Sequence, residues 1–202
     1  MSYFNKKKFT MRQVVGLLTG VFLGITVIAY AAVTVPNTFT SGTTISSSQV
    51  NANFTALGNA MPAVKAVEST NYTTVTSTSG QNILSLTVTP PVNGYIILTG
   101  SGDVGIAQSV ATNNYAYISL TTTSGAFSAA NSTSMVLGTS SPIGLQWVPL
   151  SITAVFPVTG GVATTFYLTA MRDATGSNTI YVGNYTTDTQ LTALFVPGTA
   201  LP

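Results

Sequence analysis

Short runs rich in Val, Ile, Thr and Tyr alternate with clusters of Gly, Ser, Asn and Pro from about residue 67 onward. This pattern is typical of an all-β sandwich or barrel, in which each run is a strand and each cluster a turn. Eight runs have the length of strands, and eight is the strand number of a jelly roll. We therefore predict a jelly-roll sandwich of about eight to ten antiparallel strands. The eight runs are residues 72–78, 82–89, 94–106, 114–122, 146–157, 162–171, 178–183 and 189–196.

Alternating apolar and polar residues support the predicted strands near the C-terminus. Ile152, Ala154 and Phe156 share one face of the run at residues 146–157. The run at residues 189–196 is apolar on both faces near its end. Burial on both faces predicts a central strand, or a strand that meets another subunit.

The residue types that perform most proton-transfer and metal chemistry are absent or scarce in this sequence. Its 202 residues include no His and no Cys, and only 5% of them are charged. Nucleophilic catalysis, general acid–base catalysis and zinc binding all depend on such groups. Phosphate-loop and dinucleotide-binding fingerprints are absent too. The composition predicts a protein that is not an enzyme and has no cofactor and no metal.

The first 31 residues have the three parts of a secretory signal peptide. Basic residues lie at positions 6–12, an apolar run covers residues 14–29, and Ala29 and Ala31 form an A-x-A cleavage site. An uncleaved anchor is the alternative, because apolar character continues to about Val35, which is long enough to span a bilayer. Either reading predicts a secreted or cell-surface protein.

The remainder of the chain is faintly acidic. Four of the six cations lie before residue 13, which leaves Lys65 and Arg172 against four acids, a net charge of −2. Nucleic-acid binding requires a basic patch on the folded domain, so we expect none here. Thr and Ser are abundant, and we expect their hydroxyls to face solvent where charges are missing.

A connector and a short helix precede the predicted β domain. Residues 32–45 are Thr-rich and contain Pro and Gly, which indicates an extended arm. Apolar residues then recur at helical spacing from Val50 to Met61, and Pro62 ends the pattern. A helix this short is only marginally stable by itself. We therefore expect its apolar stripe to dock on the main domain or on the same helix of other subunits. The predicted organisation is residues 1–31 as signal peptide or anchor, 32–66 as arm and helix, and 67–202 as β-sandwich domain.

Two segments resemble a known family. Residues 87–98 comprise an apolar strand, a Pro-containing turn and Asn93-Gly94-Tyr95 at the start of a long strand. Together with the closing run at 191–197, they resemble the C1q/TNF-like jelly rolls of bacterial secreted proteins. The resemblance covers roughly residues 67–197, and residues 39–54 resemble a segment found in bacterial surface and fibre proteins. It implies a jelly roll that trimerises through one sheet.

Family members often hold calcium through clustered carboxylates. Here Asp103, Asp173 and Asp188 are isolated from one another in the sequence. The departure from the family pattern is consistent with the prediction that no metal is bound.

Several apolar and aromatic residues are candidates for contacts between subunits. Tyr115 and Tyr117 share one face of a predicted strand, where they line a subunit seam or a binding surface. Trp147, the single Trp, fits a core or intersubunit anchor better than a carbohydrate platform. The full candidate set is Val50, Phe54, Leu57, Tyr115, Tyr117, Trp147 and Phe195. Asn-x-Ser/Thr sequons, which glycosylation would require, occur at Asn53, Asn71, Asn131 and Asn184.

These observations predict an exported structural or adhesive module without catalytic activity. The expected assembly is a homotrimeric C1q/TNF-like jelly roll at the cell surface, whose surface ligand is not identified. The alternative is an extracellular, pilus-like filament subunit, in which residues 32–45 of one copy add a strand to the sheet of the next.

Overall fold

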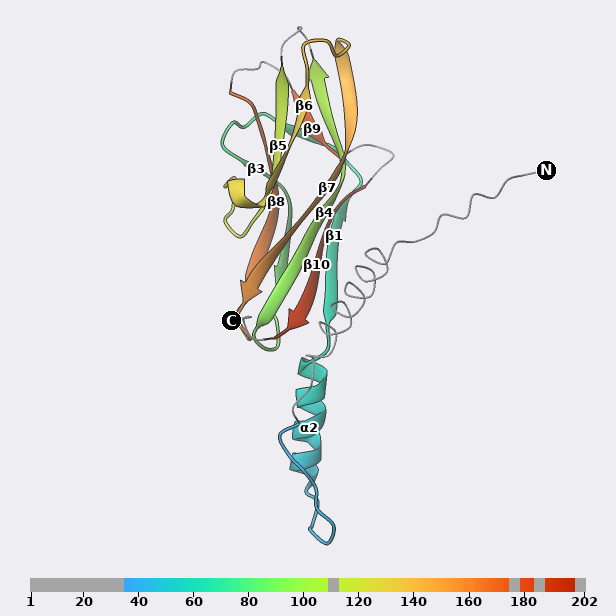
Figure 1. Ribbon diagram of the computed structural model, residues 1–202, viewed down its shortest axis with the longest axis vertical. Coiled ribbons are helices and arrows are strands. Elements are labelled where there is room, and N and C mark those ends of the chain that lie inside the picture. Colours follow the sequence, from blue (N-terminus) through green and yellow to red (C-terminus); the bar gives the residue numbers. More distant parts are fainter. Residues whose placement is uncertain (1–34, 109–112, 175–178, 184–187, 199–202) are drawn as a thin grey trace, which may run out of the picture. The chain divides into compact units, whose positions relative to one another are not determined.

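The computed structural model describes residues 35–108, 113–174, 179–183 and 188–198. The chain divides between Ala60 and Met61 into two compact units (Figure 1). Within its described residues, the first unit contains the helix α2 (Ser47–Asn59), and the second contains ten strands and a short 3-10 helix, η1 (Ala129–Asn131). The strands are β1 (Ala63–Ser69), β2 (Thr73–Val75), β3 (Gln81–Val88), β4 (Gly94–Gln108), β5 (Asn114–Thr121), β6 (Ser132–Leu137), β7 (Gly144–Val158), β8 (Thr164–Arg172), β9 (Ile180–Val182) and β10 (Thr189–Pro197).

A capping box starts α2. The Ser46 hydroxyl accepts a hydrogen bond from the Gln49 backbone N–H, and the Gln49 side chain accepts one from the Ser46 backbone N–H. This reciprocal pair satisfies two backbone donors at the helix start. None of the α2 residues is buried, so the helix exposes its apolar stripe.

Residues 35–45 fold back on α2 instead of forming the predicted extended arm (Figure 1). The backbone N–H of Asn37 donates to Asn53 Oδ1 over 2.9 Å, and Asn53 Nδ2 donates to the Asn37 carbonyl over 2.8 Å. The Asn37 side chain also donates to the Gln49 carbonyl. The side-chain amide of Asn53 therefore satisfies both backbone groups of Asn37, as a neighbouring strand would in an extended arm.

The second unit is a sandwich of two antiparallel sheets, which confirms the predicted fold class. Sheet A has the order β1-β10-β4-β9-β2, with β7 paired along the other side of β4. Sheet B has the order β3-β8-β5-β6. The pairs nest within one another along the chain: β5 with β6, then β4 with β7, β3 with β8, and β1 with β10. This nesting makes the sandwich a jelly roll.

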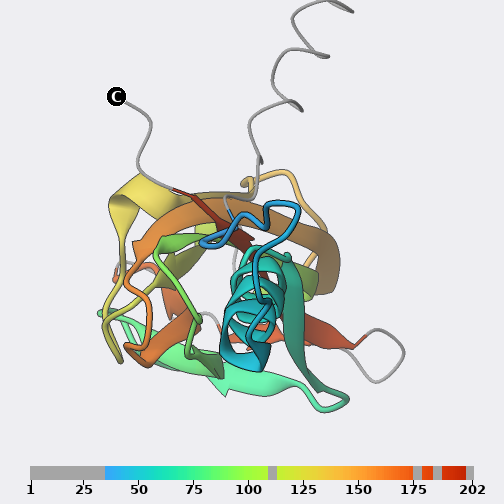
Figure 2. The same ribbon diagram turned by 90° about the horizontal axis from the view of Figure 1, so that it is seen from below.

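Alternate side chains of both sheets fill the space between them. Figure 2 shows the strands surrounding the region that these side chains occupy. Burying one large apolar side chain stabilises a fold by about 1.5–3 kcal/mol, so a core of this size can stabilise a chain that has no cysteine. The largest fully buried side chains include Phe166, Phe195, Ile96, Leu98, Ile118, Leu120, Leu168 and Leu191.

Eight of the ten strands lie where the sequence predicts them, and β1 and β6 were missed. The predicted boundary between residues 66 and 67 falls inside β1, which pairs with β10 over its full length. β1 begins directly after a proline and contains the charged residues Lys65 and Glu68, so its sequence resembles that of a connector. β6 begins with Ser-Thr-Ser, and hydroxyl residues on both faces concealed its alternation.

Candidate functional site

The outer face of sheet A, which points away from the core, carries a continuous apolar row. Val64 of β1 pairs with Leu194 of β10, Leu194 with Ile97 of β4, and Ile97 with Val155 of β7. These four residues, named here the apolar band, cross four neighbouring strands. Val64 is 68% exposed and Val155 57% exposed, while Leu194 and Ile97 between them are half-buried. Apolar side chains are thus presented to solvent in one line.

Hydroxyl side chains replace the apolar ones farther along the same face. Thr192, Thr99 and Thr153 form the second row beyond Val155 and its partners. The hydroxyls of Thr99 and Thr153 lie 3.2 Å apart and hydrogen-bond to each other. The middle of the face is therefore polar but uncharged, as the composition predicts.

Three aromatic rings lie at the other end of this face. The rings of Trp147 and Tyr181 are 6.5 Å apart between centroids, with planes at 44°. Tyr72 meets Tyr181 edge-on at 5.4 Å. Trp147 and Val155 are eight residues apart on β7, a distance of about 27 Å along a strand. This aromatic cluster, Trp147 with Tyr181 and Tyr72, is therefore well separated from the apolar band.

The glycine opposite Trp147 determines how the indole lies. Gly105 pairs with Trp147 across β4 and β7. A methyl group added at Gly105 would come within 2.8 Å of Trp147 Cζ3 and 3.0 Å of two further ring carbons. The indole consequently lies directly on the backbone of β4, where a larger residue would displace it.

The tyrosines predicted as contacts lie on the other sheet. Tyr115 and Tyr117 stack at 5.9 Å on the outer face of sheet B, and Phe127 meets Tyr117 edge-on at 6.1 Å. Burial, the Asp173 carboxylate and the neighbouring Tyr115 raise the pKa of Tyr117 above its ordinary value. The structure thus separates these tyrosines from Trp147, which lies on the outer face of sheet A.

The remaining candidates fall in different places. Phe54, which is 68% exposed, lies on α2 with Leu57 and the half-buried Val50. The expectation for Phe195 needs correction, because its side chain is 2% exposed in the core. Odd-numbered residues of β10 point inward, so Phe195 does not reach a second chain. The cleavage-site residues Ala29 and Ala31 lie outside the described residues.

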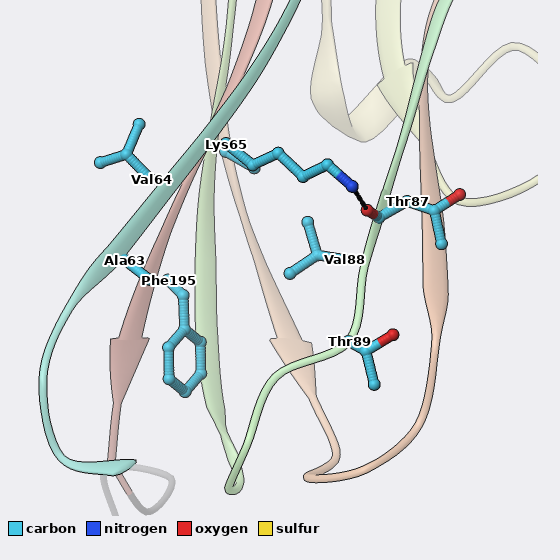
Figure 3. Close-up of a pocket in the computed structure, with 8 residues that line it drawn as sticks. Ala63, Val64, Lys65, Thr87, Val88, Thr89 and Phe195 are labelled. Carbon is cyan, nitrogen blue, oxygen red and sulfur yellow. Dashed lines mark hydrogen bonds between the residues drawn. The ribbon is translucent and has the colours of Figure 1, made fainter. Parts of the chain in front are cut away.

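A pocket opens at the edge of the sandwich between β1 and β3 (Figure 3). Its volume is about 500 Å³. Lys65 extends from β1 across the pocket, and its Nζ donates a 2.8 Å hydrogen bond to the Thr87 carbonyl of β3. With one cation and mostly apolar walls, the pocket offers packing space but no acid–base pair. It is lined by Ala63, Val64, Lys65, Thr87, Val88, Thr89, Ala193 and Phe195.

The acids do not gather into a metal site within the described part of the chain, where no three His, Cys, Asp or Glu residues lie together. Among the described helices, none is both long and apolar enough to cross a membrane. The sequon residue Asn53 uses its side-chain amide to bind Asn37, and Asn184 lies outside the described residues.

The residues of the apolar band were not singled out from the sequence, nor were Tyr72 and Tyr181. Alternation along each run does indicate which residues point outward. The apolar band forms only when four strands pair in one register. The sequence of a single strand does not indicate its register with the neighbouring strands. Comparison with protein families and with curated proteins finds no match for this chain.

Proposed function

We propose that this chain is an exported, non-enzymatic structural or adhesive module that assembles at the cell surface as a homotrimeric, C1q/TNF-like jelly roll. The observation that carries the proposal is the apolar band across the outer face of sheet A. The resemblance noted in the sequence implies trimerisation through one sheet, and sheet A offers an uncovered apolar row for such a contact.

The exposure of the band favours a partner. Val64 and Val155 leave more than half of their surface in water in a single copy. Burying apolar surface stabilises a complex by about 25 cal/mol per Å², and contiguous exposed apolar patches mark interaction sites. The half-buried Leu194 and Ile97 between them would form the centre of the contact.

The scarcity of charge on this face supports the same conclusion. Among its described residues, the outer face of sheet A carries the acids Glu68 and Asp103, both outside the apolar band. Interface centres are depleted of charged residues, because burying an ion requires removing its water. The band can therefore be covered without burying an ion.

Helix α2 supplies a second place where copies can meet. Its 13 residues are too few for a stable isolated helix, and Phe54 and Leu57 are exposed along it. Packing these side chains against the same helix of other copies would stabilise it. The signal-peptide pattern at residues 1–31 supports export, and the lack of His and Cys supports a role without catalysis.

The molar mass of the purified protein in solution, measured by light scattering, tests the proposal. We expect three times the mass of one chain. Val155→Glu should reduce the mass to one chain, because it places a charge in the band. Val136→Glu is the matched control: Val136 is 55% exposed but lies on β6 of sheet B, so this variant should remain trimeric. Circular dichroism should show the same β content for all three proteins.

A stable monomer of the unmodified protein would overturn the trimer. Filaments in electron micrographs that disappear when residues 32–45 are deleted would instead support strand donation. That assembly requires Asn37 to leave its hydrogen bonds with Asn53 and Gln49.

A further inference from the structure

The aromatic cluster holds an indole that lies against the backbone of β4 and is still partly exposed. Trp147 lies on Gly105, whose missing side chain lets the ring approach the backbone. The Trp147 side chain is nevertheless 39% exposed. A Trp that served mainly as a core anchor would be covered on both faces, so this ring has a surface available to a ligand.

Two tyrosines extend the surface beside the indole. Tyr181 is tilted by 44° from the indole plane, and Tyr72, which is 38% exposed, stands edge-on to Tyr181. β9 carries Tyr181 next to Gly105, and Tyr72 immediately precedes β2. The three rings therefore come from three segments and form an aromatic corner that is partly exposed.

A carboxylate lies beside this corner. Asp103 is two residues before Gly105 on β4 and points to the same face, about 7 Å farther along the strand. Within the described residues, Asp103 has no ion pair. The Lys65 ammonium binds the Thr87 carbonyl, and Arg172 Nε donates to the Thr76 carbonyl on another part of the sandwich.

We propose that the aromatic cluster and Asp103 bind a methylated ammonium group, of the kind that a choline head group carries. The faces of Trp and Tyr attract a cation within about 6 Å of the ring centroid, and quaternary ammonium groups are recognised by such rings. Asp103 adds a negative charge on the same side. A cation is favoured over a neutral sugar because the carboxylate would otherwise face the ligand without a counter-charge.

This inference adds a ligand class to the proposed adhesive module and does not rest on the trimer. The aromatic cluster is about 27 Å from the apolar band along β7. A ligand at the cluster and a subunit on the band can therefore be tested separately.

The single tryptophan makes the experiment direct, because all tryptophan fluorescence comes from Trp147. Purified protein is titrated with choline chloride, with sodium chloride at equal ionic strength as reference. The control ligand is 3,3-dimethylbutan-1-ol, which has the shape of choline without its charge. We expect saturable quenching by choline and binding of the neutral alcohol that is about tenfold weaker or more.

Variants separate the contributions of ring and charge. Asp103→Asn should weaken choline binding about threefold to tenfold, and Tyr181→Leu should weaken it similarly, whereas Tyr181→Phe should keep most of it. Trp147→Leu should abolish choline binding. Because this variant has no tryptophan, its binding is measured by ligand-observed NMR. Tyr167→Leu on sheet B is the matched control and should bind as the unmodified protein does. Unchanged circular dichroism confirms that each variant is folded.

Three binding results would overturn the inference. They are equal binding of choline and its neutral analogue, quenching by a neutral saccharide without any response to choline, and no response to choline at all. A fall in the molar mass of Trp147→Leu would also overturn it, because Trp147 would then be a subunit contact. A monomeric protein that binds choline would overturn the trimer and leave this inference intact.

Discussion

Lys65 Nζ donates a 2.8 Å hydrogen bond to the main-chain carbonyl of Thr87 and so links the edge strand of sheet A to the edge strand of sheet B. Lys65 lies opposite the buried Ala193 of β10, so its side chain points toward the opening of the sandwich. The ammonium thus bridges the two sheets across the pocket between β1 and β3.

Replacing Lys65 by Met should lower the free energy of unfolding by about 0.5 kcal/mol, because the hydrogen bond to the Thr87 carbonyl is exposed and water replaces part of what is lost. Urea unfolding followed by circular dichroism measures the change. Lys65→Arg retains a cationic donor and should lie closer to the unmodified protein. Equal stability of Met and Lys at this position would show that the hydrogen bond contributes nothing.

Gly105→Ala should displace the Trp147 indole, because the added methyl would lie 2.8 Å from a ring carbon. Overpacking of this kind costs about 1–3 kcal/mol. We expect a lower urea midpoint and a red shift of the tryptophan emission as the ring moves into water. Gly138→Ala is the control, since its methyl meets only Asn113 Oδ1, at 4.0 Å. An unchanged emission spectrum in Gly105→Ala would contradict the stated contact.

Thr169→Val should destabilise the domain through a buried hydroxyl pair. The hydroxyls of Ser119 and Thr169 are fully buried and 2.8 Å apart. Without the Thr169 hydroxyl, Ser119 Oγ loses one partner and keeps the hydrogen bond from the Ser128 N–H, so we expect a cost of about 1 kcal/mol. The double variant Ser119→Ala with Thr169→Val should cost less than the sum of the two single changes. Urea unfolding of all four proteins provides the cycle.

An exposed pair of the same geometry controls for this effect. Thr87 and Thr165 also have hydroxyls 2.8 Å apart, at an exposed position of sheet B. Because water replaces the lost partner there, Thr165→Val should change stability by about 0.5 kcal/mol or less. Additive single changes at Ser119 and Thr169 would contradict the proposed coupling.

Stability should fall at alkaline pH partly through Tyr117. Burial, Asp173 and Tyr115 raise its pKa in the folded protein above the ordinary value of 10.0. Well below pH 10.0 the phenol of Tyr117 is protonated in both the folded and the unfolded chain, so its contribution to stability is fully present. As the pH rises through 10.0, the phenol ionises first in the unfolded chain. The stability therefore falls until the pH has passed the pKa of Tyr117 in the folded protein.

Tyr117→Phe should therefore lose less stability than the unmodified protein above that pH. Urea unfolding of both proteins at a series of alkaline pH values measures the difference. Parallel curves would indicate that the pKa of Tyr117 is the same in the folded and unfolded chains.

Local pattern was sufficient for most of the strands but not for their arrangement. The runs at residues 94–106 and 146–157 were predicted separately, and β4 and β7 follow them closely. β6 was missed because Ser132, Thr133 and Ser134 at its start put hydroxyl groups on both faces and concealed the alternation. The turn back along α2 was missed because it depends on Asn37 meeting Asn53, 16 residues away.

The candidate surfaces show the same limit. Trp147 was recognised as distinctive because it is the single Trp. Its partners Tyr72 and Tyr181 are more than 30 residues from it and from each other, and pairing of β7, β4 and β9 brings them together. Phe195 was assigned to a subunit contact because its run is apolar on both faces, but its side chain is buried in the core.

Strand β7 contains Pro149 and Pro157, which pair with Asp103 and Tyr95 of β4. Within sheets, proline is tolerated on edge strands where the missing N–H faces solvent. Each proline therefore removes one main-chain donor from the border of β7 that faces away from β4, at positions eight residues apart. A further strand added there would lose main-chain hydrogen bonds at two points. Growth of the sheet in that direction is thus disfavoured, which favours closed assemblies that meet face to face over open-ended ones that extend edge to edge.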